Sequence, residues 1–305
     1  MTMTAQPIHT VAFIGLGQMG RPMAANLAKA GFELRVMDRS VEAVRHFLAT
    51  HTANAFNTPR EAAADSDALI TMLPAGQDVR EVLIGRTPED PDAARRGLRP
   101  GSLVIDTSSS APLLTRDTGA HLAAAGIAML DAPVSGGVPR ARDGTLAIMV
   151  GGDPNALERV RPVLSALGSK IFPVGPLGSG HAMKALNNYV SAAGLAAAAE
   201  ALLVGCRFGL DPRVMTDVLN ASTGRNNSTE NKLKQHILSG TFASNFSLDL
   251  MAKDLATAVE LARALGAPMP LAERCVRLWK DANVELGRGA DHTEIYRFLE
   301  QLKES

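Results

Sequence analysis

Hydrophobic positions change their spacing partway along the chain. In the first half, short runs of aliphatic and β-branched residues alternate with stretches whose apolar residues recur every three to four positions. The short runs predict strands at residues 9–14, 33–37, 68–72, 103–106 and 127–130, with a further pair at 147–150 and 170–172. Because strands alternate with helical stretches, we expect right-handed crossovers and a parallel sheet covered on both faces.

The second half follows a helical pattern. After Phe172 we expect no further strand, and alanine- and leucine-rich periodic segments occupy residues 179–209, 248–265, 270–285 and 292–302. The pattern predicts an α/β domain over residues 1–175 and an all-α domain over residues 176–305, joined by a long helix. The length of 305 residues suits two domains of ordinary size.

Composition narrows the class of protein. Hydrophobic residues make up 46% of the chain, and 31 basic residues balance 31 acidic ones. This balance gives no electrostatic basis for nucleic-acid binding, which requires clustered positive charge. The seven histidines show no ligand spacing, so no metal is expected. Cys206 and Cys275 lie far apart and are expected to be reduced, buried thiols.

Neither a secretory signal nor a membrane span is expected. Residues 1–10 lack a charged segment followed by an apolar one. The most apolar stretch, residues 192–203, contains Glu200 and falls short of the ~18 residues that a span needs. We therefore expect a cytoplasmic protein with no membrane partner.

A glycine-rich loop follows the first predicted strand. Gly15, Gly17 and Gly20 form a G-x-G-x-x-G pattern that leads into a helix, with Leu16, Gln18 and Met19 between them. Such a loop turns tightly and brings the pyrophosphate of a dinucleotide onto the helix N-terminus. A strand, this loop and a helix in succession predict a Rossmann-type domain.

An acidic residue follows at the distance that the pattern requires. Asp38 ends the next predicted strand, 18 residues after Gly20, where a carboxylate would bind the ribose 2′-hydroxyl. This favours NAD as the cofactor. Arg39 keeps NADP possible, because an arginine there can accept a 2′-phosphate.

Four motifs in order resemble the β-hydroxyacid dehydrogenase family, which includes 3-hydroxyisobutyrate dehydrogenase and tartronate semialdehyde reductase. The resemblance runs from Val11 to about Leu302. The motifs are Gly15-Leu16-Gly17-Gln18-Met19-Gly20-Arg21-Pro22-Met23-Ala24, Asp131-Ala132-Pro133-Val134-Ser135-Gly136-Gly137, Gly175-Pro176-Leu177-Gly178-Ser179-Gly180-His181-Ala182-Met183-Lys184-Ala185-Leu186-Asn187-Asn188, and Met251-Ala252-Lys253-Asp254-Leu255.

The resemblance implies a substrate site. Ser135, Gly136 and Gly137 would hold the substrate carboxylate, for which a hydroxyl and exposed N–H groups are suited. Lys184 would be the catalytic residue: burial and a nearby nicotinamide cation disfavour a charged lysine, so that it could accept the substrate hydroxyl proton. Asn188 lies one helical turn further and would bind the substrate.

Further cofactor contacts rest on the resemblance. Lys253 would close over the cofactor from the helical domain, and Ser109 would reach the nicotinamide end. Met72, Leu73 and Pro74 would line the adenosine or nicotinamide side. The polar loop at residues 222–227 either reaches the substrate or only connects two helices.

The predicted function is reversible NAD-dependent oxidation of a small 3-hydroxy acid, such as 3-hydroxyisobutyrate, to its semialdehyde in a cleft between the domains. One alternative is reduction of tartronate semialdehyde or another small aldehyde acid, including a sulfonated one. An alternative of another class is a non-catalytic dinucleotide-binding module. An imine reductase is disfavoured by Lys184, and a sugar-phosphate dehydrogenase by the short helical domain. Family resemblance also implies a homodimer or homotetramer.

Overall fold

The chain divides into two units. The structure is a computed structural model that describes residues 7–302. Contacts within the chain separate residues 1–184 from residues 185–305. Residues 1–6, part of the N-terminal segment in which no signal was expected, lie outside the described residues. The domain boundary between residues 175 and 176 stays a prediction.

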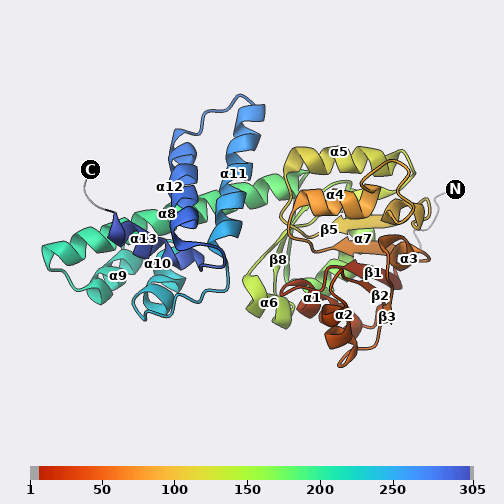
Figure 1. Ribbon diagram of the computed structural model, residues 1–305, viewed down its shortest axis with the longest axis horizontal. Helices are drawn as coiled ribbons and strands as arrows, with labels where there is room; N and C mark the ends of the chain where they lie inside the picture. The colour runs from red at the N-terminus through yellow and green to blue at the C-terminus, as the bar shows by residue number, and fades with distance from the viewer. Residues whose placement is uncertain (1–6, 303–305) are drawn as a thin grey trace. The chain divides into compact units, whose positions relative to one another are not determined.

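The first unit is built on a sheet of nine strands within the described residues, in the order β3-β2-β1-β4-β5-β6-β8-β7, with β9 paired to β8. Figure 1 shows the sheet with helices such as α4 and α5 beside it. The strands are β1 (Thr10–Ile14), β2 (Glu33–Met37), β3 (Asn54–Ala55), β4 (Ala68–Thr71), β5 (Leu103–Asp106), β6 (Ala128–Asp131), β7 (Val134–Ser135), β8 (Ala147–Gly151) and β9 (Lys170–Gly175). From β3 to β6 all neighbours run parallel. The parallel sheet predicted from the sequence is therefore confirmed.

Helices cover both faces of this sheet. They are α1 (Gly20–Lys29), α2 (Val41–Leu48), α3 (Pro59–Ala63), α4 (Gly76–Ile84), η1 (Ala94–Arg96), α5 (Pro112–Ala123), α6 (Gly137–Asp143) and α7 (Pro154–Leu167). Side chains of β1 alternate between two cores: Val11 and Phe13 join the cluster with α1 and α7, whereas Ala12 and Ile14 join that with α4 and α5. Because both faces are buried, these strands read as continuous hydrophobic runs.

The far edge of the sheet differs from a simple parallel arrangement. Strand β8 runs antiparallel to β6 and β7. The two-residue strands β3 and β7 were not predicted, because two residues are too short to show alternation. Strand β9 continues past Phe172 through Pro173, which a strand paired on one side tolerates.

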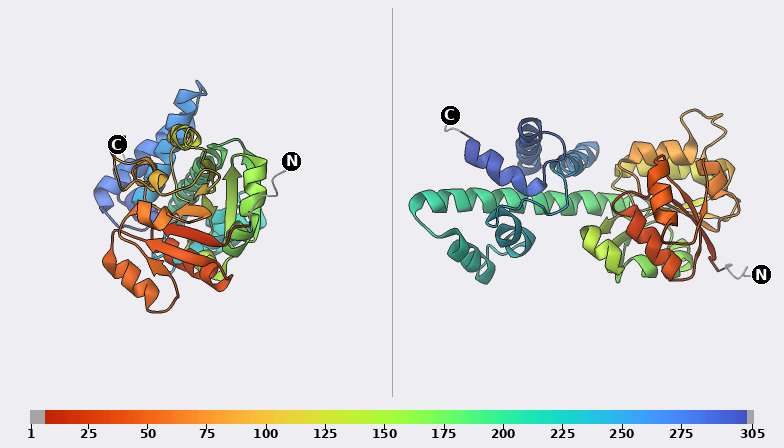
Figure 2. Two further views of the ribbon diagram at one scale, coloured as in Figure 1. Left: turned by 90° about the vertical axis from the view of Figure 1, so that its right-hand side faces the viewer. Right: turned by 60° about the horizontal axis from the view of Figure 1, so that its bottom comes forward.

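The second unit is helical, as predicted. Beginning with the long helix, its elements are α8 (Ser179–Phe208), α9 (Pro212–Ala221), α10 (Asn227–Asn231), the π-helix η2 (Leu233–Ile237), α11 (Leu248–Ala264), α12 (Pro270–Leu286), η3 (His292–Glu294) and α13 (Ile295–Gln301). Its core gathers Leu195 and Leu202 of α8 around Trp279 and Ile295, all fully buried. Figure 2 shows α8 as one unbroken helix.

Helix α8 is also the one helix, among the described residues, that is long and apolar enough to cross a membrane, with a mean hydropathy of 1.6 over its most apolar window. From the sequence no span was expected here, because Glu200 interrupts the alanine-rich stretch. Its buried alanines and leucines form the core of the helical unit. Of that window, 39% is buried inside the protein, and one helix of this length and composition does not by itself indicate a membrane span.

One expectation about the cysteines is wrong. Both thiols are free, but only Cys275 is buried, whereas Cys206 is exposed. Cys206 lies in the last turn of α8, two residues before the largely exposed Phe208, where the helix has left the core.

Candidate active site

The carboxyl ends of β1 and β4 mark the point where the strand order reverses. The chain goes from β1 to β2 on one side and returns to β4 on the other. Open α/β sheets bind ligands outside the strand ends at such a point. The predicted cofactor residues Gly15, Leu16 and Gly17 follow β1 here, and Met72, Leu73 and Pro74 follow β4.

Backbone contacts at this point leave no room for side chains on two of the glycines. A Cβ on Gly15, whose φ is +106°, would lie 2.3 Å from the carbonyl oxygen of Met72. A Cβ on Gly20 would lie 1.8 Å from the carbonyl oxygen of Gly15. Gly17 differs, because no atom beyond Gly17 itself and its two chain neighbours lies within 4 Å of its Cβ position. The loop is therefore packed tightly at Gly15 and Gly20 and open at Gly17, where a ligand can approach the backbone.

The rest of the loop leads directly into α1. Gln18 is exposed and Met19 is half-buried just before the helix begins at Gly20. In the first turn of α1, Arg21 donates its N–H to the Gly17 carbonyl oxygen at 3.1 Å and Pro22 has no N–H, so the helix itself contributes mainly the positive end of its dipole. The arrangement offers an anion such as a pyrophosphate a favourable field.

Asp38 lies beside the loop. Its Oδ2 accepts a hydrogen bond from the N–H of Leu16 at 2.6 Å, and its Oδ1 accepts one from Ser40 N–H at 2.7 Å. The carboxylate is thus held next to the glycine-rich turn, where it suits a diol. Arg39 is largely exposed and lies 3.6 Å from Asp78 of α4 in an ion pair. An exposed pair of this kind contributes little and leaves the guanidinium mobile.

Polar side chains at the end of β5 complete this edge. Asp106 accepts hydrogen bonds from Thr71 Oγ1 at 2.9 Å and Ser110 Oγ at 2.8 Å. Ser108 Oγ accepts one from Leu73 N–H at 2.9 Å. Ser109, a predicted nicotinamide contact, lies half-buried between these residues. The loops after β4 and β5 are therefore joined on the side where the cofactor contacts are predicted.

These residues fit a dinucleotide. The open backbone at Gly17 and the positive end of the α1 dipole match a pyrophosphate. The carboxylate of Asp38 matches the adenosine ribose. The negative charge of Asp38 would repel the 2′-phosphate of NADP, so the carboxylate favours NAD. The exposed guanidinium of Arg39 could nevertheless bind that phosphate.

Lys184 lies against the predicted carboxylate-binding segment. Its side chain is 9% exposed, and its Nζ donates a hydrogen bond to the carbonyl oxygen of Val134 at 2.9 Å. Val134 directly precedes Ser135, Gly136 and Gly137, which connect β7 to α6. The fold of the first unit thus brings together two predicted substrate motifs that lie about 50 residues apart in the chain.

A buried network that sequence reasoning missed holds the start of α8. Asp131, with no exposed surface, accepts hydrogen bonds from the N–H groups of Gly178 and His181, both at 2.7 Å. A carboxylate at a helix N-terminus satisfies otherwise unpaired donors and interacts favourably with the dipole. From the sequence, Asp131 was recognised only as part of a motif and no role was predicted for it. The feature that could have revealed the role is an acidic residue at the end of a buried strand.

His181 is the centre of this network. Its Nε2 lies 3.1 Å from the carbonyl oxygen of Ser108, which can only accept, so Nε2 carries the proton. Its Nδ1 lies 2.8 Å from Thr115 Oγ1, and the carboxylates of Asp106 and Asp131 each lie 3.6 Å from the ring. The imidazole therefore links the strand ends to the helix that carries Lys184.

The second unit holds the remaining predicted residues. Asn188 is 6% exposed, and its Nδ2 donates to Asp254 Oδ2 of α11 at 2.5 Å. Lys253 forms an ion pair with Asp254 across 3.7 Å. Asn187 donates to the side-chain oxygen of Asn188 at 3.2 Å. Asn188 and Lys253 therefore share Asp254, a neighbour whose role sequence reasoning had not singled out.

The polar loop considered earlier ends in a helix cap. Asn226 caps α10 by accepting from the N–H groups of Ser228 and Thr229. Its amide also lies near Gly194 of α8. These contacts are explained if the loop at residues 222–227 only connects two helices, which was one of the two alternatives for it.

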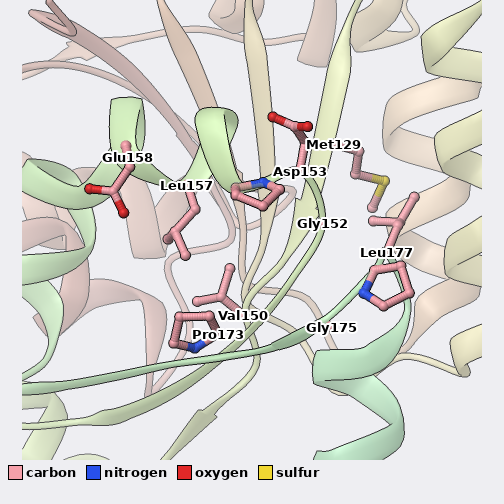
Figure 3. A pocket seen from close by; sticks show the side chains of 11 residues that line it. Met129, Val150, Gly152, Asp153, Leu157, Glu158, Pro173, Gly175 and Leu177 are labelled. Atoms are coloured by element: carbon pink, nitrogen blue, oxygen red, sulfur yellow. The ribbon is translucent and has the colours of Figure 1, made fainter.

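A separate shallow pocket of about 540 Å³ lies in the first unit, between the start of α7 and the ends of β8 and β9 (Figure 3). None of the predicted site residues lines it. Its two carboxylates already have partners, because Asp153 caps α7 and Glu158 pairs with Arg161. The walls are otherwise mainly proline, glycine and aliphatic side chains.

Two family models match nearly the whole described chain. Residues 10–175 match the NAD binding domain of 6-phosphogluconate dehydrogenase. Residues 178–299 match a model described as NAD-binding of NADP-dependent 3-hydroxyisobutyrate dehydrogenase. The chain therefore carries NAD(P)-binding domains.

Individual relatives agree with these models. A 3-hydroxyisobutyrate dehydrogenase of Pseudomonas aeruginosa is 40% identical over 86% of this chain and 88% of its own length. A 2-(hydroxymethyl)glutarate dehydrogenase of Eubacterium barkeri is 36% identical over 96% of this chain and 95% of its own. A 3-sulfolactaldehyde reductase of Escherichia coli is 38% identical over 97% of this chain and 96% of its own.

A solved structure extends the likeness to three dimensions. The 3-hydroxyisobutyrate dehydrogenase of Mycobacterium tuberculosis, studied with L-serine, aligns with a TM-score of 0.87 and 35% identity, covering 96% of this chain and 99% of that one. Imine reductases share the fold at about 20% identity. With matching models over both halves and relatives up to 40% identical along its length, the chain belongs to the β-hydroxyacid dehydrogenase family.

Proposed function

We propose that this protein is an NAD-dependent dehydrogenase that reversibly oxidises a small 3-hydroxy acid to its semialdehyde. The observation that carries the proposal is the position of Lys184, a buried amine held beside the segment Ser135-Gly136-Gly137 through its bond to Val134. Acid–base chemistry on a hydroxy acid needs a group that exchanges a proton and, next to it, a segment that binds the substrate carboxylate. The buried lysine and the Ser135-Gly136-Gly137 segment supply these two parts.

The residues have the following roles. Ser135, Gly136 and Gly137 bind the substrate carboxylate, and Asn188 binds its hydroxyl or carboxylate. Lys184 takes the hydroxyl proton at Nζ during oxidation and returns it to the carbonyl oxygen during reduction. The bound nicotinamide supplies the acceptor for the hydride that leaves the carbon. Positioning the substrate is the main contribution of the other residues.

Most of the residues proposed to bind the cofactor belong to the first unit. Gly15 to Gly20 hold the pyrophosphate, Asp38 holds the adenosine ribose, and Arg39 gives a route to NADP. Met72, Leu73, Pro74 and Ser109 line the cofactor, and Lys253 contributes from α11. In this proposal residues 1–175 form the dinucleotide domain, and residues 176–305 serve substrate binding and assembly into a homodimer or homotetramer in the cytoplasm.

The proposal names a class of substrate, small 3-hydroxy acids and their aldehydes, and not a single compound. The relatives act, by their names, on 3-hydroxyisobutyrate, L-serine, 2-(hydroxymethyl)glutarate and 3-sulfolactaldehyde. All of these fit a three-carbon acid or aldehyde core with one variable substituent, and a pocket separates such compounds through one or two contacts.

The test is the absorbance of reduced nicotinamide during incubation with NAD or NADP and a panel of small 3-hydroxy acids. We expect turnover of at least one acid, with a loss of kcat of roughly 10²–10⁴-fold in Lys184→Ala while NAD binding is retained. Unchanged turnover in that variant would remove Lys184 from the mechanism. NAD binding without turnover of any acid or semialdehyde would instead support the non-catalytic dinucleotide-binding alternative.

A further inference from the structure

Lys232 is a half-buried lysine in the helical unit that none of the predicted roles uses. It is the single residue between α10 and the π-helix η2, with φ −129° and ψ −39°. Its Nζ lies 3.5 Å from Ser191 Oγ, a long contact for an ammonium group that has three donors. No carboxylate of the described residues lies within 4.0 Å of this Nζ.

Ser191 places Lys232 next to the proposed substrate residues. On α8, Lys184, Asn188 and Ser191 stand at i, i+4 and i+7, so they share one face of the helix. Ser191 lies three residues beyond Asn188, which is roughly 4.5 Å further along the axis. Lys232 therefore presents its ammonium group to the same helix face as Asn188, less than one turn beyond it.

Asp291, whose negative charge acts on Lys232, already has other hydrogen-bond partners. Asp291 already accepts hydrogen bonds from Thr293 N–H at 2.9 Å, Thr293 Oγ1 at 2.6 Å and Ser244 Oγ at 2.9 Å. Burial lowers the pKa of Lys232 to about 8, and the Asp291 charge opposes that shift only in part. A partly desolvated cation with unused donors is stabilised by an anion that binds to it.

We propose that Lys232, with Ser191, forms a subsite for a second anionic group at the far end of the substrate. This deepens the proposed function and rests on it: the substrate class becomes 3-hydroxy acids that carry a distal carboxylate or sulfonate. An arm of two methylenes and a carboxylate reaches roughly 4 Å from the central carbon, which matches the step from Asn188 to Ser191.

The first test compares two substrates that share the reacting hydroxymethyl group and its carboxylate. 3-Hydroxyisobutyrate carries a methyl arm, whereas 2-(hydroxymethyl)glutarate carries a two-methylene arm ending in a carboxylate. We expect the wild-type enzyme to favour the glutarate in kcat/KM. In Lys232→Met the ratio of the two kcat/KM values should fall by roughly 10- to 100-fold, mainly through KM of the glutarate.

Two further variants separate charge from structure. Lys232→Arg retains the positive charge and should recover part of the ratio. Lys234→Met removes a neighbouring lysine whose partner is Asp217 on α9, and should keep the wild-type ratio. If Lys232→Met lowers kcat/KM for both acids equally, or if Lys234→Met has the same effect, Lys232 is structural and the subsite is wrong.

A binding measurement keeps the two proposals apart. Calorimetry with the full-length protein and NAD compares glutarate and 4-sulfobutyrate with butyrate, which lacks the distal charge. Glutarate or 4-sulfobutyrate should bind more tightly than butyrate, and that advantage should be lost in Lys232→Met; which anion binds better identifies the distal group. This result would support the subsite even if no acid were oxidised, in which case the proposed function alone would fail. Equal binding of the charged compounds and butyrate would overturn the subsite.

The pH dependence provides a second readout. The preference for the distal anion should weaken by up to tenfold per pH unit as Lys232 loses its proton above about pH 8. Among the described residues, the charge of Asp291 acts on Lys232, Lys232 acts on His292, and His236 acts on His292 in turn. Taking the ratio of the two substrates at each pH cancels effects common to both, including those of Lys184. A ratio that stays constant from pH 7 to 10 in the wild type would contradict the subsite.

Discussion

Lys184 Nζ donates a hydrogen bond to the carbonyl oxygen of Val134 across 2.9 Å, within the first unit of the chain. The carbonyl oxygen belongs to the residue just before the Ser135-Gly136-Gly137 segment, so a side chain of α8 is anchored to the loop proposed to bind the substrate carboxylate. This hydrogen bond fixes the position of the amine beside that loop.

Replacing Lys184 by arginine keeps a positive charge and hydrogen-bond donors, but a guanidinium group stays protonated in proteins and cannot exchange a proton with the substrate. We expect kcat of Lys184→Arg to fall by roughly 10²-fold or more, because the proposed reaction depends on proton transfer by this residue. Steady-state kinetics with the best acid of the panel measures this, and NAD titration serves as the control. Retention of more than a tenth of the wild-type kcat would indicate that the lysine acts only through its charge.

The glycine-rich loop offers a matched pair of variants. In Gly20→Ala the new Cβ would lie 1.8 Å from the Gly15 carbonyl oxygen, so we expect destabilisation of roughly 3–5 kcal/mol. In Gly17→Ala the Cβ meets no atom beyond its two chain neighbours within 4 Å, so stability should change by less than about 1 kcal/mol. NAD affinity should nevertheless fall at least tenfold, about 1.4 kcal/mol, because the methyl group occupies the approach of the pyrophosphate.

Thermal denaturation and NAD titration of the two variants check this pair. A Gly17→Ala protein that binds NAD as tightly as the wild type would show that the cofactor does not approach the backbone there.

Asp38 and Arg39 are expected to set the choice of cofactor. Removing the carboxylate in Asp38→Ala should lower the ratio of kcat/KM for NAD to that for NADP by roughly tenfold or more, because the ribose loses its acceptor and the 2′-phosphate loses a repelling charge. Arg39→Ala should shift the ratio the other way. The ratio is the quantity to compare, because Asp38→Ala also removes the hydrogen bond to Leu16 N–H and this should weaken the binding of both cofactors. An unchanged ratio in both variants would place cofactor selection elsewhere.

His181 is expected to be a positioning residue. His181→Leu leaves the Ser108 carbonyl and Thr115 hydroxyl without their partner and removes the imidazole between two buried carboxylates. We expect a loss of roughly 2–4 kcal/mol in unfolding free energy. A fall in kcat with a smaller change in KM should accompany it, because the start of α8 carries Lys184.

The exposed His121 of α5 supplies the comparison: His121→Leu should alter neither stability nor kcat measurably. A His181→Leu enzyme with wild-type kcat would mean that the network stabilises the fold without positioning Lys184.

Acid should destabilise the helical unit through His292. Burial lowers the pKa of His292 to about 4, and the Lys232 charge adds to this effect. The unfolded chain takes up the proton near pH 6.5, whereas the folded chain does so only near pH 4, so stability present above pH 6.5 is lost as the pH falls through this window. The lowered pKa of Asp291 acts below the window.

The expected loss from this histidine is up to about 2 kcal/mol between pH 6.5 and 5, from about 1.4 kcal/mol per pH unit. Urea denaturation followed by the fluorescence of Trp279, the one tryptophan of the chain, reports on this unit because the indole stacks on His292 at 6.5 Å. His292→Asn should have a smaller pH slope than the wild type. The same slope in both proteins would show that another group takes up the proton.

The sequence alone determined the two-part architecture and the order of its elements. The central strands β1, β4 and β5 are buried on both faces, so they appear as uninterrupted hydrophobic runs. Helices such as α5 and α12 begin at prolines in their first turn. Local spacing was also sufficient for the glycine-rich loop and Asp38, because a tight turn and the strand after it are set by neighbours in the chain. The short strands β3 and β7 carried too few residues for any periodicity.

Tertiary structure alone decided which of these residues meet. The sequence places Lys184 fifty residues from Val134, and the bond between them exists because β6, β7 and the start of α8 converge at one end of the sheet. The same holds for His181 with Asp106 and Asp131, and for Asn188 with Asp254. The partial burial of Lys232 and its contact with Ser191 likewise come from packing between segments about 40 residues apart. Burial and charge balance depend on contacts far apart in the chain, and a linear pattern contains no information about the distance between two side chains that the fold brings together.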